Sequence, residues 1–379
     1  MNIITLSSTD PAFSPDALRN ADFIAVHGNC DADLGTLKLG DVKGHVHGAT
    51  SCLGAMTDAG VSEGAGLFVI EDPDGAYGTA MAALGTDPAN AAREATLAAL
   101  RRADRIGETP DLIWVSSTPG SEEDVLTGIE TVVGPDVPII GGSAADNSVS
   151  GDWHVFNASG QITEGVIVSV LFPSCSVSFA YHNGYAPTAA GGTVTRVEGR
   201  RVHEIDHRPA LDVYREWTSN AVDGVDPSQD SQSILSESTL WPLGRKVAEL
   251  DGVSSYLLAH PAMANGDGSI DLFATVEEGE FLTQMNGTET SLVERAGRVV
   301  SLARAAGQME AQPIAGALMV YCGGCMLSVR ERLDEVIGGV SQALDSAPFL
   351  GTFTFGEQGQ ILGAGNRHGN LMISCIVFG

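Results

Sequence analysis

Basic residues are scarce in this sequence. Its 379 residues include 20 lysines and arginines against 48 aspartates and glutamates, which gives a formal net charge of −28. A charge of this sign repels phosphate backbones and anionic lipid surfaces. We therefore expect neither nucleic acid nor a membrane among the partners of this protein. Because the acidic residues are scattered along the chain, their excess is typical of a solvated surface.

Long apolar runs are also missing. No segment reaches the roughly 18 consecutive apolar residues of a membrane span. The first residues, Met1 to Ser8, lack the basic and apolar regions of a signal peptide. Six cysteines are spread widely over the chain, which favours reduced thiols with one special pair over a disulfide framework. These features predict a cytoplasmic protein.

Motifs for nucleotide binding and haem attachment are absent as well. The glycine-rich turns have neither phosphate-loop nor dinucleotide-binding spacing, and no C-x-x-C-H occurs. No known motif places a histidine beside one of the cysteines. Hydrolytic catalysis therefore has no positive support, and we expect a protein that is not an enzyme.

The length and the composition predict a globular chain of two domains. A chain of 379 residues exceeds what one compact core needs, and 43% hydrophobic against 18% charged residues is typical of folded proteins. We predict an α/β fold in the mixed α+β sense, with two domains whose mixed parallel and antiparallel sheets are flanked by helices. Small residues and prolines cluster at 187–192, so the predicted domains are 20–188 and 189–379.

Apolar periodicity predicts the individual elements. Predicted strands lie near 23–26, 66–70, 112–115, 153–156, 165–172, 177–181, 193–197, 254–258, 281–285, 349–355, 360–362 and 371–378. Predicted helices lie near 90–105, 121–132, 292–306 and 326–344, with a short helix starting at 209.

The sharpest local feature is a pair of cysteines, Cys322 and Cys325, separated by two glycines. The apolar run 317–321 ends there and a helix is predicted to begin at once. Free N–H groups at a helix N-terminus lower the pKa of a thiol. The two cysteines are thus candidate metal ligands, redox thiols or ligand contacts, unless they only pack a strand-to-helix turn. A four-cysteine zinc site is not implied, because no second C-x-x-C exists.

Two further turns carry polar side chains next to glycines. The turn 141–147 follows a strand and contains Ser143, Asp146 and Asn147. Its exposed N–H groups are suited to approach a small ligand, although a purely structural turn has the same pattern. Glu357 and Gln358 stand between two glycines at the end of an apolar strand. Such side chains point either into a cleft or into solvent.

The nine histidines form no clear metal site. His203 and His207 are four residues apart, but we expect them on a strand and its turn rather than on one helix face. His27, His45 and His47 form another cluster, near the first glycine-rich region.

Several segments in this order resemble the FIST family, whose N-terminal and C-terminal domains follow one another. The resemblance covers about residues 20–378. The matching segments are residues 48–51 (GATS), 137–147 (VPIIGGSAADN), 205–214 (IDHRPALDVY), 260–261 (HP) and 355–359 (FGEQG).

The resemblance implies a bacterial or archaeal intracellular sensory protein. Such proteins are proposed to bind small ligands such as amino acids and to signal to histidine kinases or cyclic-di-nucleotide proteins. Some stand-alone FIST proteins are nitric oxide sensors that bind haem, and this chain resembles the stand-alone type. His207 departs from the small residue expected at its position, so either it is a ligand or that turn differs.

We therefore expect a small-ligand or cofactor pocket between the two domains, where concave sites gather. An organic ligand without metal is the first expectation. Haem on His207 is the second, and an iron–sulfur cluster or zinc on Cys322 and Cys325 is the third. A thiol-dependent enzyme that uses the cysteine pair, and a pure interaction scaffold, are the competing classes. The expected pocket residues are Ser143, Asp146, Asn147, Tyr214, Cys322, Cys325, Glu357 and Gln358.

Overall fold

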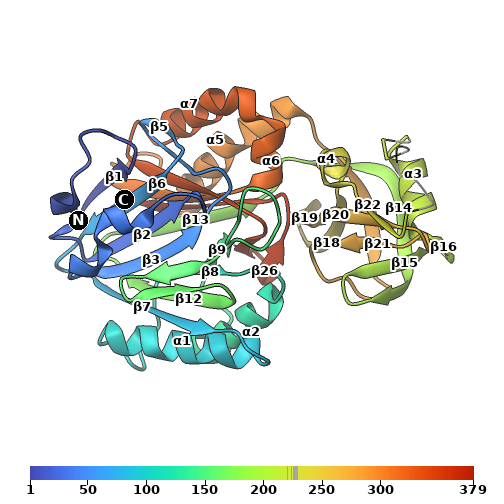
Figure 1. The fold of residues 1–379 in the computed structure, drawn as a ribbon. Helices are drawn as coiled ribbons and strands as arrows, with labels where there is room; N and C mark the ends of the chain where they lie inside the picture. The colour runs from blue at the N-terminus through green and yellow to red at the C-terminus, as the bar shows by residue number, and fades with distance from the viewer. Residues whose placement is uncertain (220, 223, 225–228) are drawn as a thin grey trace.

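The computed structural model describes residues 1–379 apart from residues 220, 223 and 225–228. In this described part, the strands form four sheets, in which parallel and antiparallel pairs occur together with flanking helices. The predicted mixed α/β fold is confirmed. Figure 1 shows a larger unit and a smaller one. We call residues 1–182 and 289–379 the main body, and the described part of 186–286 the β-domain.

The main body contains three six-stranded sheets. The first runs in the order β1 (Asn2–Ser7), β6 (Ala65–Glu71), β2 (Phe23–Gly28), β3 (His45–Thr50), β10 (Val155–Asn157), β11 (Gly160–Ile162). The second runs β26 (Gly365–Gly369), β25 (Glu357–Ile361), β9 (Ile139–Ser143), β8 (Leu112–Ser117), β12 (Gly165–Phe172), β7 (Ala76–Ala83). The third runs β13 (Val177–His182), β27 (Ile373–Phe378), β23 (Gly316–Cys322), β24 (Phe349–Thr354), β4 (Ala55–Thr57), β5 (Gly60–Ser62).

Each of these sheets contains one parallel pair: β2 with β3, β8 with β9, and β23 with β24. Parallel strands require a crossover connection. The crossovers carry the short helices η2 and η3, the helix α2, and the series α6, η4 and α7, respectively. The third crossover starts directly after β23, and this is the point at which the cysteine pair lies.

Helices cover the outer faces of the main body, and α1 and α2 lie on the side opposite α5 and α7 (Figure 1). Helix α1 packs on β7 and β12, and α5 packs on β13 and β27. The helices are α1 (Pro88–Arg102), α2 (Glu122–Val133), α5 (Glu289–Ala306), α6 (Gly323–Ser328) and α7 (Leu333–Ala343). The 3-10 turns are η1 (Pro15–Leu18), η2 (Leu34–Leu37), η3 (Leu39–Asp41) and η4 (Arg330–Arg332).

The β-domain is built around the fourth sheet and has its own apolar core. Its helices are α3 (Ala210–Trp217) and α4 (Leu235–Ser238). Its strands, in spatial order, are β17 (Ser231–Ser233), β20 (Pro261–Asn265), β21 (Ile270–Leu272), β15 (Arg201–Ile205), β14 (Ala186–Glu198), β22 (Phe281–Asn286), β18 (Leu243–Leu250) and β19 (Val253–Ala259), with β16 (Arg208–Pro209) beside β15.

Segments from both ends of the chain share sheets in the main body. Strand β25 pairs with β9, and β24 pairs with β4. The three sheets also share one core cluster, which includes Phe68 of the first, Trp114 of the second and Leu318 of the third. The division at 188/189 stays a prediction, and the main body joins residues from both sides of it.

Most predicted elements lie where apolar periodicity placed them. Strand β12, for example, is an almost fully buried apolar run, as expected for a strand covered on both faces. The helix predicted over 326–344 is wrong in one respect, because the chain forms α6, the turn η4 and then α7. Val329 has φ −120° and ends α6. The apolar spacing continues across this break because Val329 and Leu333 stay buried on either side of it.

Candidate functional site

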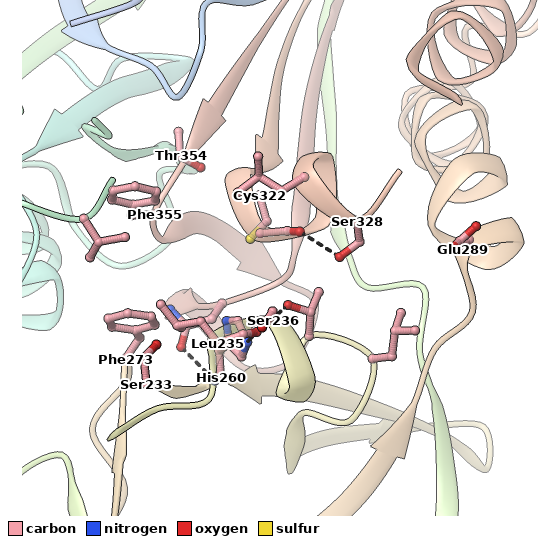
Figure 2. A pocket seen from close by; sticks show the side chains of 16 residues that line it. Ser233, Leu235, Ser236, His260, Phe273, Glu289, Cys322, Ser328, Thr354 and Phe355 are labelled. Carbon is pink, nitrogen blue, oxygen red and sulfur yellow. Dashed lines mark hydrogen bonds between the residues drawn. The ribbon is translucent and has the colours of Figure 1, made fainter. Parts of the chain in front are cut away.

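A cavity of about 540 Å³ lies between the main body and the β-domain (Figure 2). Residues of the β-domain form one side of it, and residues of the main body form the other. The lining residues are Val149, Ser233, Leu235, Ser236, Thr239, Leu240, His260, Phe273, Glu289, Cys322, Gly324, Leu327, Ser328, Thr354, Phe355 and Asn370.

The main-body side is built at the ends of two parallel strands. Cys322 is the last residue of β23, and its register partner Thr354 is the last residue of β24. The carboxyl ends of parallel strands are a frequent position for ligand sites in open α/β sheets. Phe355 follows directly, and Figure 2 shows it on the same side of the cavity as Cys322 and Thr354.

The β-domain side contributes a buried imidazole. His260 lies between β19 and β20, and its Nε2 is 3.2 Å from the carbonyl oxygen of Leu235 in α4. Burial lowers the pKa of His260 to about 4, so the ring is neutral at physiological pH. Because Nε2 then donates its proton to Leu235, Nδ1 keeps its lone pair and can accept a hydrogen bond.

A side-chain amide in the wall of the cavity has an unused donor. Asn370 is 2% exposed, and its Oδ1 accepts a hydrogen bond from the backbone N–H of His260 at 3.2 Å. Its Nδ2 has no hydrogen-bond partner in the described part of the chain. Buried polar groups are nearly always paired, so this donor is a candidate ligand contact.

The charge of the lining limits the ligands that fit. No lysine or arginine is among the lining residues, and the carboxylate of the exposed Glu289 is the one formal charge among them. An anion buried without a partner is strongly unfavourable. The cavity is thus unsuited to phosphate groups and suited to small, mainly apolar molecules that are neutral or carry an amine.

Gly324 marks the space between the two sides. A Cβ at this position would lie 3.6 Å from Cε1 of His260 and 3.8 Å from Sγ of Cys322, which are ordinary contact distances. The imidazole and the thiol therefore face the same small volume. A larger side chain at residue 324 would occupy this volume without straining the backbone of α6.

The two cysteines have opposite environments. Cys322 is 5% exposed and lines the cavity, whereas Cys325 is fully buried behind it. Burial and a hydrogen bond to Cys325 raise the pKa of the Cys322 thiol well above its usual value. Burial would also raise the pKa of Cys325, but the hydrogen bond from Cys322 and the charge of Arg295 outweigh it and lower that pKa to about 6.

Both thiols were expected to be acidic at the start of the helix, but the pKa is lowered only for Cys325, and Cys322 keeps its proton. The acidic thiol is Cys325, because α5 places a guanidinium beside it. Nη2 of Arg295 is 3.4 Å from Sγ of Cys325, and the hydroxyl of Tyr185 is also 3.4 Å from that sulfur. No sequence motif links Arg295 to the cysteine pair, so the sequence analysis missed it.

Glu357 lies in the core next to this group and does not line the cavity. Its carboxyl oxygens are 2.9 Å from the hydroxyl of Thr354 and 2.9 Å from the backbone nitrogen of Met372. Burial raises the pKa of Glu357 to about 8 despite these hydrogen bonds. At neutral pH its carboxyl group is therefore mainly protonated.

Ser143 and Gln358 belong to another buried cluster. The hydroxyl of Ser143 donates to Oε1 of Glu122 at 2.9 Å, and Nε2 of Gln358 is 3.4 Å from that hydroxyl. Arg200 of the β-domain binds Oε2 of Glu122 at 2.8 Å. Burial opposes ionisation of Glu122, but His368 and Arg200 hold its pKa below the usual range. This cluster joins the two units beside a second, polar cleft that His368 lines.

Asp146 and Asn147 organise a loop rather than line the cavity. The Asp146 carboxylate accepts the backbone N–H groups of residues 148–152, at distances of 2.5 to 3.0 Å. Val149, within this loop, does line the cavity. The side chain of Asn147 accepts from the backbone of Leu53 and donates to Asn29 and Asp31.

Tyr214 and His207 lie in the β-domain, away from the cavity lining. Tyr214 is buried in the β-domain core, and its hydroxyl donates to the carbonyl of Trp241 at 2.8 Å. His207 is exposed in the turn between β15 and β16, with φ +60°. Figure 1 shows this turn on the side of the β-domain far from α6.

Two short segments match the sequence patterns of catalytic motifs. Residues 203–207 read H-E-I-D-H, but they lie on β15 and its turn, whereas the zinc motif requires both histidines on one helix face. Residues 60–64 read G-V-S-E-G, but they lie on β5 and a turn, and the hydroxyl of Ser62 donates to the carbonyl of Ala65. Neither segment forms the strand–turn–helix or helical context that such chemistry needs.

The residues do not fit the metal alternatives. Among the described residues, no group of three or more histidine, cysteine, aspartate or glutamate side chains is arranged to hold a metal ion. An exposed His207 offers no axial ligand in an apolar cleft for haem. The cavity itself has no basic side chain to pair with the carboxylates that haem carries.

No helix of the described chain has the length and apolar character needed to cross a membrane.

Comparison with known proteins gives one family and several distant likenesses. The FIST N domain matches residues 39–208 and the FIST C domain matches residues 210–360. An uncharacterized protein of Methanocaldococcus jannaschii is 31% identical over 101 residues, which cover 26% of this chain and 19% of that relative. The chain therefore aligns with less than a fifth of the length of this curated relative.

Two solved structures show weaker likeness. The crystal structure of a cyanuric acid hydrolase from A. caulinodans is 11% identical, covers 99% of this chain and 97% of its own, and has a TM-score of 0.38. PurLQS from Thermotoga maritima is 8% identical, covers 80% of this chain and 72% of its own, and has a TM-score of 0.23. Neither score supports an argument about fold or function. With a FIST N domain followed by a FIST C domain, the chain belongs to the FIST family of sensory domains.

Proposed function

We propose that this protein is a signal-transduction sensor that binds a small organic ligand in the cavity between the β-domain and the main body. The observation that carries the proposal is the unpaired Nδ2 donor of Asn370 in the wall of a 540 Å³ cavity lined by both units. Cavities of this size, mainly apolar with a few polar groups, are typical of small-molecule sites.

The lining favours a particular ligand chemistry. Asn370 offers a hydrogen-bond donor and Nδ1 of His260 an acceptor, while Leu235, Phe273 and Phe355 offer apolar surface. An apolar amino acid satisfies these contacts, because its zwitterion has no net charge: the carboxylate accepts from Asn370 and the ammonium group donates to Nδ1 of His260. The lack of lysine and arginine in the lining opposes ligands with phosphate groups.

The position of the cavity supports a signalling role. A ligand that contacts both units binds best to conformations in which both units reach it. Ligand binding therefore increases the population of these conformations. We propose that a histidine kinase or a cyclic-di-nucleotide protein in the cytoplasm reads this shift.

We further propose that the protein acts by binding and not by catalysis. Nucleophilic catalysis needs an accessible thiolate. Here the acidic thiol of Cys325 is fully buried, and the thiol of Cys322, which lines the cavity, keeps its proton. This supports a sensor over a thiol-dependent enzyme.

Thermal-shift and calorimetric titrations with a panel of apolar amino acids, haem, iron and zinc test the proposal. A ligand at about 100 times its Kd stabilises the native state by about 2.7 kcal/mol. We expect an apolar amino acid to bind, and Gly324→Val to weaken this binding because its side chain enters the space between His260 and Cys322. Gly338→Ala, in the exposed face of α7, is the matched control. An affinity that Gly324→Val leaves unchanged, or no binding by any member of the panel, would overturn the proposal.

A further inference from the structure

Arg295 is a buried cation without a carboxylate partner. It is 2% exposed, and its guanidinium lies 5.5 Å from the ring centroids of both Tyr185 and Tyr321. Its nitrogens donate to the carbonyl oxygens of Leu371 and Met372, at 2.9 and 3.4 Å. Within the described chain no aspartate or glutamate comes within ion-pair distance of it.

A buried guanidinium requires a nearby negative charge. The hydroxyls of Tyr185 and Tyr321 already donate to the carbonyls of Thr239 and Leu292. The remaining acidic group in contact with Arg295 is the sulfur of Cys325, at 3.4 Å. Cys325 is thus the counter-ion of Arg295, as a buried thiolate.

Cys322 connects this ion pair to the cavity. Its thiol lines the cavity and hydrogen-bonds to Cys325. The two cysteines together therefore hold one proton, and Cys322, which lines the cavity, can pass that proton to Cys325 behind it. This is the arrangement needed for a thiol that becomes nucleophilic only when a reaction partner arrives.

We propose that Cys322 and Cys325 form a redox switch that is oxidised by small, uncharged organic disulfides entering the cavity. The inference rests on the proposed function, because it uses the same cavity. Uncharged disulfides are favoured because the lining has no lysine or arginine to pair with an anionic one.

Thiol–disulfide exchange between the cysteine pair and the small disulfide has two steps. Cys322 passes its proton to Cys325 and attacks one sulfur of the small disulfide, whose S–S bond breaks and releases one thiolate. Cys325 then gives that proton to the released thiolate, which leaves as a thiol, and attacks Sγ of Cys322. The bond between Cys322 and the second half of the small molecule breaks, and this half leaves as a thiolate. The Cys322–Cys325 bond forms, and one thiol and one thiolate leave. The cysteine pair loses two electrons, which the small disulfide gains.

Oxidation has a structural consequence because it removes the anion beside Arg295. Glu357 is an acid that interacts with both Cys325 and Arg295, and it accepts a hydrogen bond from the backbone N–H of Met372. Once Cys325 is neutral, Glu357 becomes the group that can ionise to balance Arg295. Strand β25 carries Glu357 and Met372 precedes β27, so the redox state of the pair is coupled to the packing of the sheets behind the cavity.

Mass spectrometry of the full chain treated with hydroxyethyl disulfide tests the switch. Cys30 and Cys175 are partly exposed, so both are replaced by serine in every variant. We expect this parent to form an internal Cys322–Cys325 disulfide. Adding Cys325→Ser should instead trap one mercaptoethanol adduct on Cys322, formed more slowly than the disulfide of the parent because the thiol has lost its proton acceptor, and adding Cys322→Ser should abolish both products. Cys375→Ser, at another buried cysteine, is the matched control and should leave the internal disulfide unchanged.

The outcomes separate the switch from the proposed function. A parent that stays reduced, or an internal disulfide that still forms after Cys322→Ser, overturns the switch. If such a protein still binds the amino-acid panel, the proposed sensor function stands alone. If the pair oxidises while no member of the panel binds, the switch stands and the proposed ligand class fails. The anionic glutathione disulfide should react more slowly than hydroxyethyl disulfide, and equal rates would contradict the uncharged class.

Discussion

Nη2 of Arg295 lies 3.4 Å from Sγ of Cys325, and both residues are buried in the main body. This contact joins α5 to α6 through a cation and a thiol and not through a carboxylate. Because each charge has lost its hydration, each stabilises the other in the core.

The Arg295–Cys325 contact predicts a pH dependence. The pKa of Cys325 is lowered from 9.0 to about 6. A lowered acid pKa contributes stability that is fully present above the unfolded value and is lost as the pH falls through the folded value. We expect ultraviolet thiolate absorbance to vanish as the pH falls through about 6, and the free energy of unfolding to decrease from pH 9 to pH 6.

Replacing the guanidinium tests the cause of this shift. Arg295→Gln should remove the thiolate absorbance at pH 7. It should also lower the free energy of unfolding by roughly 3 kcal/mol, mainly because the ion pair is lost. Arg298→Gln, on the exposed side of the same helix, is the control. Retention of the thiolate signal in Arg295→Gln would show that another group lowers the pKa of Cys325.

Glu357→Gln should stabilise the protein, and more so at higher pH. Burial raises the pKa of Glu357 from 4.5 to about 8, so between these values the folded state must hold a proton that the unfolded state releases, and the resulting loss of stability grows as the pH rises. Glutamine keeps an acceptor for the N–H of Met372, and its amide can donate to the hydroxyl of Thr354, which in the native protein donates to Glu357. Urea unfolding at pH 5 and pH 8 should show a gain on the order of 3 kcal/mol at pH 8 and little at pH 5. Glu331→Gln, on the surface, should show no such difference.

Asp146→Ala should loosen the loop that carries Val149. Five backbone N–H groups would lose their acceptor, which we expect to cost about 2 to 4 kcal/mol. Amide hydrogen exchange of residues 148–152 should accelerate, and ligand affinity should fall because Val149 lines the cavity. Asp152→Ala, at an exposed residue of the same loop, should leave exchange and affinity nearly unchanged.

Arg200→Ala should weaken the contact between the two units. Glu122 is 2% exposed and would be left without its cation, so we expect a loss of roughly 3 kcal/mol in stability. Exchange of the Thr275 amide, which donates to Glu123, should accelerate. Arg201→Ala removes an exposed pair with Asp271 and should cost less than about 1 kcal/mol. Equal effects of the two variants would argue against a stabilising contact between the two units at Arg200.

Local apolar patterns determined most of the elements. The strand predicted at 165–172 is β12 without change, and the helix at 292–306 is the later part of α5. Burial on one or both faces of an element sets the spacing of its apolar residues, so this information is local. The same spacing did not predict the helix break at Val329, because apolar spacing alone does not determine the backbone conformation.

The sequence by itself also singled out Cys322, which lines the cavity, and the FIST family. It did not determine which thiol is acidic, or that Tyr214 and His207 lie away from the cavity. Arg295 is 30 residues from Cys325 and meets it only because α5 packs beside the turn after β23. Asn370 and His260 likewise meet through a hydrogen bond that spans 110 residues. A counter-ion and a cavity arise from the packing of distant elements, and the local spacing of residues does not encode which elements come into contact.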